Sequence, residues 1–184
     1  MQERDLYALP PGLPVPEDDG AADHLEGTAL PAVTLDSSHG PVDISQLDVL
    51  YVYPRSGKPG EPSLPGWDDI PGMRGCTPQS CAFRDHVSEL AELGARRVAG
   101  LSVQTLADQI EFAERNHMPY PVVSDARLRL RDELGLPTIE VSGHTLYKRL
   151  ALVARHGRIA KVFYPVFPPD RNATDVVAWL RANQ

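Results

Sequence analysis

Two cysteines, Cys76 and Cys81, are the only thiols in this chain of 184 residues. Cys76 directly precedes Thr77 and Pro78, which we expect to be the N-cap and the first residue of a helix. The unpaired N–H groups and the positive dipole end at such a helix start attract an anion. Because the thiolate is the reactive form of cysteine, and Arg74 adds a positive charge nearby, the sequence predicts that Cys76 is an activated nucleophile.

The spacing of the two cysteines predicts a role for the second one. Cys81 lies five residues after Cys76 in the same predicted helix, so the two Cα atoms would be about 8.6 Å apart. A disulfide requires Cα atoms within about 7 Å, and the first helical turn must therefore unwind before the bond can form. This suits a two-step cycle in which a peroxide oxidises Cys76 to a sulfenic acid and Cys81 then condenses with it.

Other interpretations of the pair use the same residues. Both cysteines could be small buried residues with no chemical role. A zinc site of Cys76, Cys81, His86 and His117 is another interpretation, although four intervening residues on one helix are a poor spacing for chelation. The spacing excludes a C-x-x-C disulfide reductase, and two cysteines are too few for a four-thiolate zinc or iron–sulfur site. We therefore expect no metal and no cofactor.

Charge is distributed unevenly along the chain. Lys and Arg number 18 against 25 for Asp and Glu, a net charge of −7, which disfavours a nucleic acid or an anionic membrane as the partner. Residues 1–28 contain seven acids and one arginine, a local charge of −6. We predict an acidic, proline-rich arm over residues 1–27, with Leu6, Tyr7, Leu9 and Leu13 as its packing side chains, and one domain over residues 28–184.

The distribution of apolar residues along the chain bears on the cellular compartment of the protein. The chain contains no run of about 18 apolar residues that could span a bilayer. Its N-terminus has no basic start followed by an apolar block, so it does not read as a secretory signal. We therefore expect a cytoplasmic protein, in a reducing compartment where a close cysteine pair is more often redox-active than structural.

Strands and helices alternate along the body of the chain. The apolar run 49–53 predicts a buried central strand, and a long loop over 55–75, rich in proline and glycine, leads into Cys76. The resulting fold class is α/β, a central mixed sheet flanked by helices with an inserted loop before the cysteine helix, compatible with a thioredoxin-like fold. The other predicted strands are 32–36, 42–44, 98–103, 121–124, 149–154 and 158–164, and the helices are 77–93, 106–117, 126–134 and one from Asn172, as N-cap, to Ala182.

The residues around the cysteines are similar to those of a known family. Gly75-Cys76-Thr77 followed by Cys81-Ala82-Phe83-Arg84-Asp85 resembles the pattern G-C-T-x-x-x-C-x-F-R-D of the peroxiredoxins, specifically the peroxiredoxin Q or bacterioferritin-comigratory type. The similarity extends over about residues 28–164. It implies a thioredoxin fold and a thiol-dependent peroxidase, acting as a monomer or homodimer on hydrogen peroxide or organic hydroperoxides. Cys76 would attack the peroxide, Cys81 would resolve the sulfenic acid, and thioredoxin or a similar dithiol would reduce the disulfide.

The resemblance also implies a third site residue. The family places an arginine at the start of a late strand beside the peroxide-attacking sulfur, and Arg149 occupies that position. Such a cation would hold the thiolate and polarise the peroxide without losing its charge. The alternative is a surface arginine at a strand end.

The sequence departs from the family pattern before Cys76. The family has a threonine three residues before this cysteine, where this chain has Met73, and Arg74 replaces a usual proline. Lys58 takes the threonine position if the inserted loop is placed later, and Ser56 or Thr77 could supply the hydroxyl. The departure motivates a second hypothesis, a redox sensor or thiol-switch binding protein without turnover. Independently of this hypothesis, Trp67 in the inserted loop could cover the active site or mark a partner surface.

Overall fold

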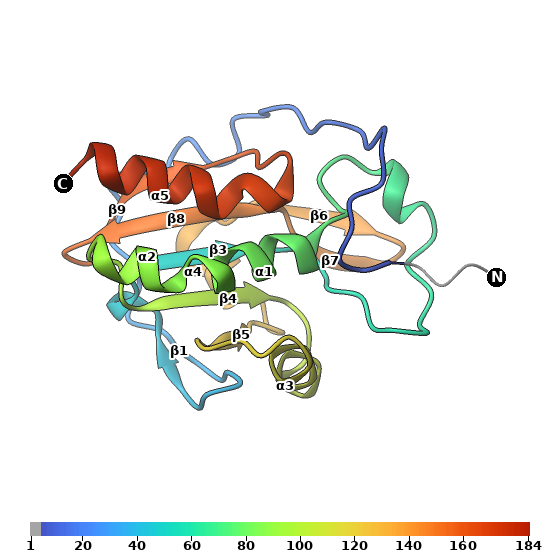
Figure 1. The fold of residues 1–184 in the computed structure, drawn as a ribbon, viewed down its shortest axis with the longest axis horizontal. Coiled ribbons are helices and arrows are strands. Elements are labelled where there is room, and N and C mark those ends of the chain that lie inside the picture. Colours follow the sequence, from blue (N-terminus) through green and yellow to red (C-terminus); the bar gives the residue numbers. More distant parts are fainter. Residues whose placement is uncertain (1–4) are drawn as a thin grey trace.

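A five-stranded mixed sheet forms the centre of the molecule in a computed structural model that describes residues 5–184 (Figure 1). Its strand order is β5-β4-β3-β8-β9; β3, β4 and β5 are mutually parallel, and β8 runs antiparallel to β3 and β9. The predicted central strand is confirmed, because β3 lies in the middle of the sheet with every residue buried. The bounds are β3 Val49–Val52, β4 Val98–Ser102, β5 Val122–Ser124, β8 Leu150–Arg155 and β9 Arg158–Phe163.

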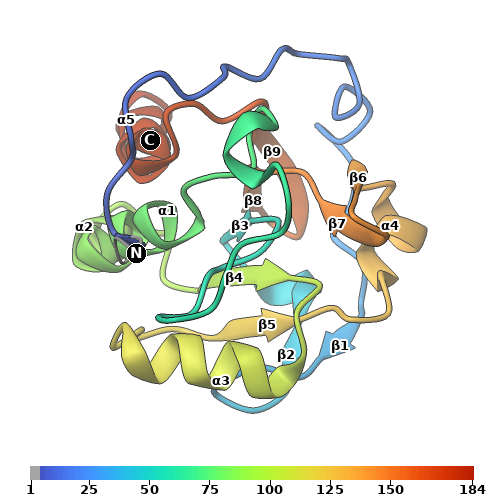
Figure 2. The same cartoon turned by 90° about the vertical axis from the view of Figure 1, so that its right-hand side faces the viewer.

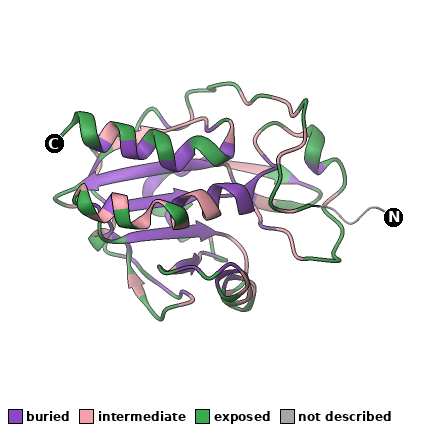
Figure 3. Ribbon diagram, viewed as in Figure 1, coloured by how far each residue is buried: buried purple, intermediate pink, exposed green. Residues whose placement is uncertain are grey.

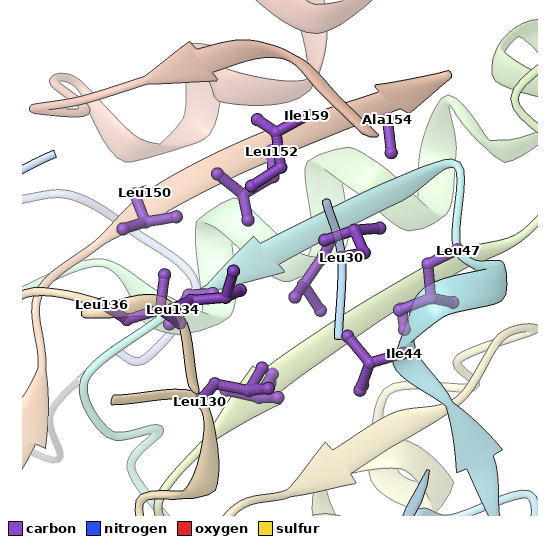
Figure 4. Packing of buried hydrophobic residues seen from close by; sticks show 14 of the residues in the cluster. Leu30, Ile44, Leu47, Leu130, Leu134, Leu136, Leu150, Leu152, Ala154 and Ile159 are labelled. Carbon is purple, nitrogen blue, oxygen red and sulfur yellow. The ribbon is translucent and has the colours of Figure 1, made fainter. Parts of the chain in front are cut away.

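Helices cover both faces of this sheet (Figure 2). Because side chains alternate along a strand, Val49 and Tyr51 face one apolar cluster and Leu50 and Val52 the other. The first cluster packs under α1, α2, α3 and α5. The second lies against α4 and residues 22–47. Figure 4 shows its leucines and Ile44 packed together on one face of the sheet. The helices are α1 Cys76–Asp85, α2 Val87–Glu92, α3 Leu106–Arg115, α4 Arg129–Leu134 and α5 Asn172–Ala182.

Two short hairpins stand outside the central sheet. The predicted pair near the N-terminus is confirmed as β1 (Thr34–Leu35) and β2 (Val42–Asp43), which are antiparallel. A second hairpin, β6 (Thr138–Val141) and β7 (His144–Tyr147), is absent from the sequence prediction. It packs through Val141 and Leu146 against Trp67 and Met73 of the 55–75 loop. The loop is therefore an ordered part of the domain, with a 3-10 turn at Trp67–Asp69.

The single helix predicted up to Gly94 is two helices in the structure. The backbone leaves helical geometry at His86, with φ −101° and ψ 5°, between α1 and α2. The His86 ring Nδ1 lies 2.8 Å from the carbonyl oxygen of Ala82, which also accepts from the His86 backbone N–H. The prediction missed this break because local side-chain to backbone bonding is not visible in the apolar period.

The described part of the N-terminal arm packs on the body (Figures 1 and 2). It passes the start of α1 and crosses the molecule past α5. Leu6, Leu9 and Leu13 are half-buried, whereas Tyr7 is 55% exposed. Farther along, the Asp19 carboxylate pairs with Lys148 Nζ at 2.6 Å and accepts from the Tyr164 hydroxyl at 2.7 Å. The division of the chain at residue 27 stays a prediction.

Burial identifies where a reactive group is shielded. Figure 3 shows that the central strands and the first turns of α1 are buried, while the outer faces of α2 and α5 are exposed. Over residues 5–184, no helix is both long and apolar enough to cross a bilayer.

Candidate active site

Cys76 is the first residue of α1, and only 4% of it is exposed. The predicted N-cap, Thr77, is wrong: Gly75 caps the helix in the left-handed region, with φ 107° and ψ 23°. This conformation is open to glycine and strained for other residues, which lets the chain turn sharply into α1. Pro78 still lies within the first turn, where its missing N–H removes no helical hydrogen bond. Cys76, as the first residue of the helix, therefore lies at the positive end of the helix dipole.

The Arg149 guanidinium lies against the Cys76 sulfur. Arg149 directly precedes β8 and is 3% exposed, and its Nη2 donates to Cys76 Sγ at 3.3 Å. The same nitrogen lies 3.1–3.2 Å from the carbonyl oxygens of Gly72, Met73 and Arg74. The structure therefore brings together two of the three residues predicted for the site, which are 73 positions apart in the chain.

A glutamine that the sequence prediction missed fixes this arginine. Gln79 is fully buried one turn after Cys76, and its Oε1 accepts from Arg149 Nη1 at 2.6 Å. Gln79 Nε2 in turn donates to Asn172 Oδ1 at 2.9 Å. The prediction of Asn172 as the N-cap of the last helix is wrong, because Asn172 is itself the first residue of α5. The Asn172 side chain bonds to Gln79 instead of capping the helix backbone. The only available sequence signal was the i, i+3 spacing of Cys76 and Gln79.

The partners of Arg149 leave its positive charge uncancelled. Within residues 5–184, its hydrogen-bond partners are amide and carbonyl oxygens and the Cys76 thiol, and it forms no ion pair with a carboxylate. Neutral acceptors hold the two Nη nitrogens of this guanidinium without neutralising it, and its Nε is buried with no hydrogen-bond partner among the described residues. The cation therefore attracts negative charge on the Cys76 sulfur, in a setting where water screens little of it.

Cys81 lies in a different environment from Cys76. It is half-buried farther along α1, and its Sγ lies 3.9 Å from Asn116 Oδ1 at the end of α3. Burial raises the pKa of the Cys81 thiol. Both cysteines are free thiols in the same helix, and ideal helix geometry keeps their Cα atoms about 8.6 Å apart. The intact helix therefore keeps the two thiols from bonding.

Two aromatic contacts hold α1 on the sheet. The Phe83 ring stacks on Tyr51 of β3, with centroids 4.4 Å apart and planes 4° from parallel. The Tyr120 hydroxyl donates to the carbonyl oxygen of Ser80 at 3.0 Å and lies 3.0 Å from the Tyr51 hydroxyl. The helix is thus anchored directly beside Cys81.

A cavity opens next to Cys76, between the inserted loop and the start of α3. Its lining includes Thr77, which is 3% exposed, and Trp67, which is 7% exposed. Trp67 thus packs beside the candidate site. Ser56 and Lys58 also line the cavity, but the Ser56 hydroxyl donates to Gln104 Oε1 at 3.1 Å and Lys58 Nζ pairs with Asp108 at 2.6 Å.

Met73 and Arg74, the two positions that depart from the peroxiredoxin pattern, have other roles in this structure. The Met73 side chain is buried with Trp67, and only its backbone oxygen reaches the site, where Cys76 Sγ donates to it at 3.7 Å. Arg74 lines the same cavity as Cys76, but its guanidinium reaches the N-terminal arm, where its Nη2 donates to the carbonyl oxygen of Asp5 at 2.6 Å. The Arg74 side chain is therefore engaged by the arm.

A family model described as Redoxin matches residues 25–178 of the chain. The chain belongs to the redoxin family. A putative peroxiredoxin of Mycobacterium tuberculosis is 32% identical over 146 residues, 79% of this chain and 80% of that protein. The chloroplastic peroxiredoxin Q of Arabidopsis thaliana is 28% identical over 162 residues, 85% of this chain and 67% of that protein.

Solved structures agree with this assignment. The crystal structure of peroxidoxin BcpB from Mycobacterium tuberculosis matches with a TM-score of 0.69 and 26% identity, over 88% of this chain and 99% of that one. Peroxiredoxin Q from Xanthomonas campestris matches with a TM-score of 0.65 and 21% identity, over 86% of this chain and 96% of that one, a likeness of fold. The thioredoxin-like fold predicted from the sequence is confirmed, and the protein is a peroxiredoxin-type thiol peroxidase of the Q type.

Proposed function

We propose that this peroxidase reduces hydrogen peroxide or small organic hydroperoxides in a cycle that begins at Cys76. The thiolate sulfur of Cys76 attacks one peroxide oxygen and the O–O bond breaks. The other oxygen leaves as hydroxide or alkoxide and takes up a proton. The cysteine is thereby oxidised to a sulfenic acid, and the peroxide is reduced to water or an alcohol.

The observation that carries this proposal is the contact between Arg149 Nη2 and Cys76 Sγ at 3.3 Å. A cation fixed at that distance stabilises the thiolate before attack and the charge that develops on the leaving oxygen. An arginine suits this role because it keeps its proton at any physiological pH. Gln79 holds the guanidinium in place, so the site is organised before the peroxide arrives.

Cys81 completes the cycle in this proposal. Its thiol attacks the sulfenic sulfur of Cys76, water leaves, and a disulfide joins the two cysteines. Because both lie in α1, the start of the helix unwinds before the sulfur atoms meet. A dithiol protein of the thioredoxin type then exchanges with the disulfide, which restores both thiols and leaves the reductant oxidised. We infer that the protein works as a monomer or homodimer.

One observation favours a second candidate function, a redox sensor without turnover. Met73 carries a thioether and no hydroxyl, and its side chain is buried among Trp67, Val141 and Leu146, so it gives a peroxide no hydrogen-bond donor. Oxidation that unwinds the start of α1 would also displace the inserted loop, and a partner could recognise that change. Steady turnover with a thioredoxin-type reductant would remove the need for this second function.

Two single-cysteine variants test the proposed cycle. Cys76→Ser should abolish peroxide consumption, because no other described thiol lies beside Arg149. Cys81→Ser should consume one equivalent of peroxide and then stall or over-oxidise. If Cys76→Ser keeps the turnover of the wild-type protein, the assignment of the nucleophile is wrong.

The cytoplasmic location stays a prediction. Relatives of the chain include chloroplastic proteins of plants and bacterial proteins. Fractionation of the native host would decide it, with peroxidase activity in the soluble reducing fraction as the expected result.

A further inference from the structure

One wall of the cavity beside Cys76 comes from the N-terminal arm. Among residues 5–27, Leu6 alone lines this cavity, together with residues of the inserted loop and of the start of α3. The cavity is small, about 70 Å³. In a space of this size, a change in the bulk of one bordering side chain changes the size of the group that the space can admit.

Two arm leucines fit against glycines that border the cavity. A Cβ atom on Gly57 would lie 2.8 Å from Leu6 Cδ2, and one on Gly75 would lie 2.9 Å from Leu9 Cδ2. Real Cβ atoms do not tolerate such distances, so these leucines occupy the space that side chains at the two glycines would need. Gly75 is also the cap of α1 and the residue before Cys76. The arm is thus fitted to the rim of the site.

Arg74 fastens the arm at this point. Its Nη2 donates to the carbonyl oxygens of Asp5 at 2.6 Å and Ala8 at 3.2 Å, which lie on either side of Leu6 in the chain. Arg74 is 9% exposed, so these hydrogen bonds are shielded from water. The backbone N–H of Tyr7 also donates to the Asp5 carboxylate at 2.9 Å, which closes a tight local turn around Leu6. Leu6 is therefore held in place.

We propose that Leu6 is a specificity-determining residue that limits the size of the group attached to the peroxide oxygen. The inference rests on the proposed function, in which peroxides reach Cys76 through this cavity. Hydrogen peroxide carries no such group, so a wider opening should change its rate of reaction with Cys76 least. A hydroperoxide with a bulky aromatic substituent, in contrast, meets the Leu6 side chain as its reacting oxygen approaches the sulfur.

The test compares two peroxides in one protein. The second-order rate constants for oxidation of reduced protein by cumene hydroperoxide and by hydrogen peroxide give a selectivity ratio for each variant. Leu6→Ala should raise the ratio of cumene hydroperoxide to hydrogen peroxide by about tenfold, the scale on which pocket methylenes discriminate between substrates. Leu6→Phe should lower the ratio. Leu13→Ala is the matched control, because Leu13 is a half-buried arm leucine that does not line the cavity.

Each outcome decides the proposal. An unchanged ratio in both Leu6 variants would overturn it, and so would an equal rise in the Leu13→Ala control, since the effect would then belong to the whole arm. Failure of the proposed function has a different signature. In that case the wild-type protein itself would leave hydrogen peroxide unconsumed, or mass spectrometry would place the oxidation on a residue other than Cys76.

Discussion

Gln79 Oε1 accepts a hydrogen bond from Arg149 Nη1 at 2.6 Å, so the cation beside Cys76 is held by a residue of the same helix that carries Cys76. Sulfur and guanidinium therefore keep their relative position for as long as the first turns of α1 persist. We call the hydrogen bond between Gln79 and Arg149 the clamp. When the first turns of α1 unwind, this hydrogen bond is lost and Arg149 is no longer held beside the sulfur. The same helical turns thus hold Arg149 beside Cys76 and keep the Cys81 thiol apart from the Cys76 thiol.

Removal of the clamp should slow the first chemical step. In Gln79→Leu, Arg149 Nη1 loses its acceptor in a buried position, and we expect oxidation of Cys76 to slow by about tenfold or more. The free energy of unfolding should fall by about 1–3 kcal/mol, the cost of an unpaired buried polar group. Gln79→Glu restores an acceptor oxygen, but its carboxylate would pair with the guanidinium and cancel the charge that acts on the sulfur, so the rate in stopped-flow measurements should stay low. Wild-type kinetics in Gln79→Leu would show that Arg149 needs no clamp.

Removal of the cation should have a larger effect. Arg149→Met should slow the oxidation of Cys76 by about 100-fold, the scale on which loss of one preorganised donor acts. Arg149→Lys keeps the charge but loses the planar fork that reaches Gln79 and Cys76 together, so an intermediate rate is expected. Arg155→Met, at the exposed end of the same strand, is the matched control and should react as the wild type does. Equal rates in Arg149→Met and its control would contradict the electrostatic role.

Burial of Cys81 predicts a pH dependence. Because burial raises the pKa of this thiol, the neutral form dominates at neutral pH in the folded helix and the thiolate appears only as pH rises. In reduced Cys76→Ser protein, alkylation of Cys81 by iodoacetamide should therefore have its pH midpoint above the ordinary value of about 8.5. Unfolding in denaturant should return the midpoint to that value. A midpoint at or below it in the folded protein would contradict the assignment.

The same shift has a consequence for stability. The folded state keeps the Cys81 proton to higher pH than the unfolded chain does, so it binds more protons above the unfolded pKa. The contribution of Cys81 to folding stability should therefore decrease as pH rises through the ordinary thiol range. Comparison of Cys81→Ser with the wild-type reduced protein in urea titrations at several pH values measures this difference.

The hydroxyl of Tyr120 should control how readily α1 unwinds. Tyr120→Phe removes the donor to the Ser80 carbonyl oxygen, which should make the helix easier to open by about 1 kcal/mol and closure of the disulfide about fivefold faster. The fraction of Cys76 that over-oxidises to sulfinic acid in excess peroxide should fall accordingly.

Tyr53→Phe is the matched control for this variant. Its hydroxyl donates to Gln109 Oε1 on α3 at 2.8 Å and forms no hydrogen bond with α1 among the described residues, so its loss should reduce overall stability similarly without changing over-oxidation. Equal over-oxidation in the two variants would show that Tyr120 does not govern the opening of α1.

Local patterns predicted most of the fold. The β-rich run that forms β3 and the proline and glycine signals around the inserted loop were sufficient to place the sheet and Cys76. The β6–β7 hairpin was missed because its strands are short and mixed in polarity. Its turn at Ser142 and Gly143, both with positive φ, was the available signal for a hairpin.

The polar contacts of the site were harder to predict. Gln79 and Asn172 are 93 positions apart, and nothing local to either residue indicates that they meet. Asn172 was interpreted as a helix cap because its type favours that position, whereas tertiary packing directs its side chain to Gln79. The use of Arg74 to hold the arm likewise depends on a contact between segments 66–69 residues apart, which a single sequence does not encode locally.

The most direct test of the account is the intact mass of the reduced protein after rapid mixing with one equivalent of hydrogen peroxide. We expect a fast loss of about 2 Da, the mass of the two hydrogens removed when Cys76 and Cys81 close an intramolecular disulfide. Peptide mapping should place the bond between these two residues. A stable gain of about 16 Da per added oxygen, or an unchanged mass after many minutes, would contradict the proposed cycle and favour the sensor.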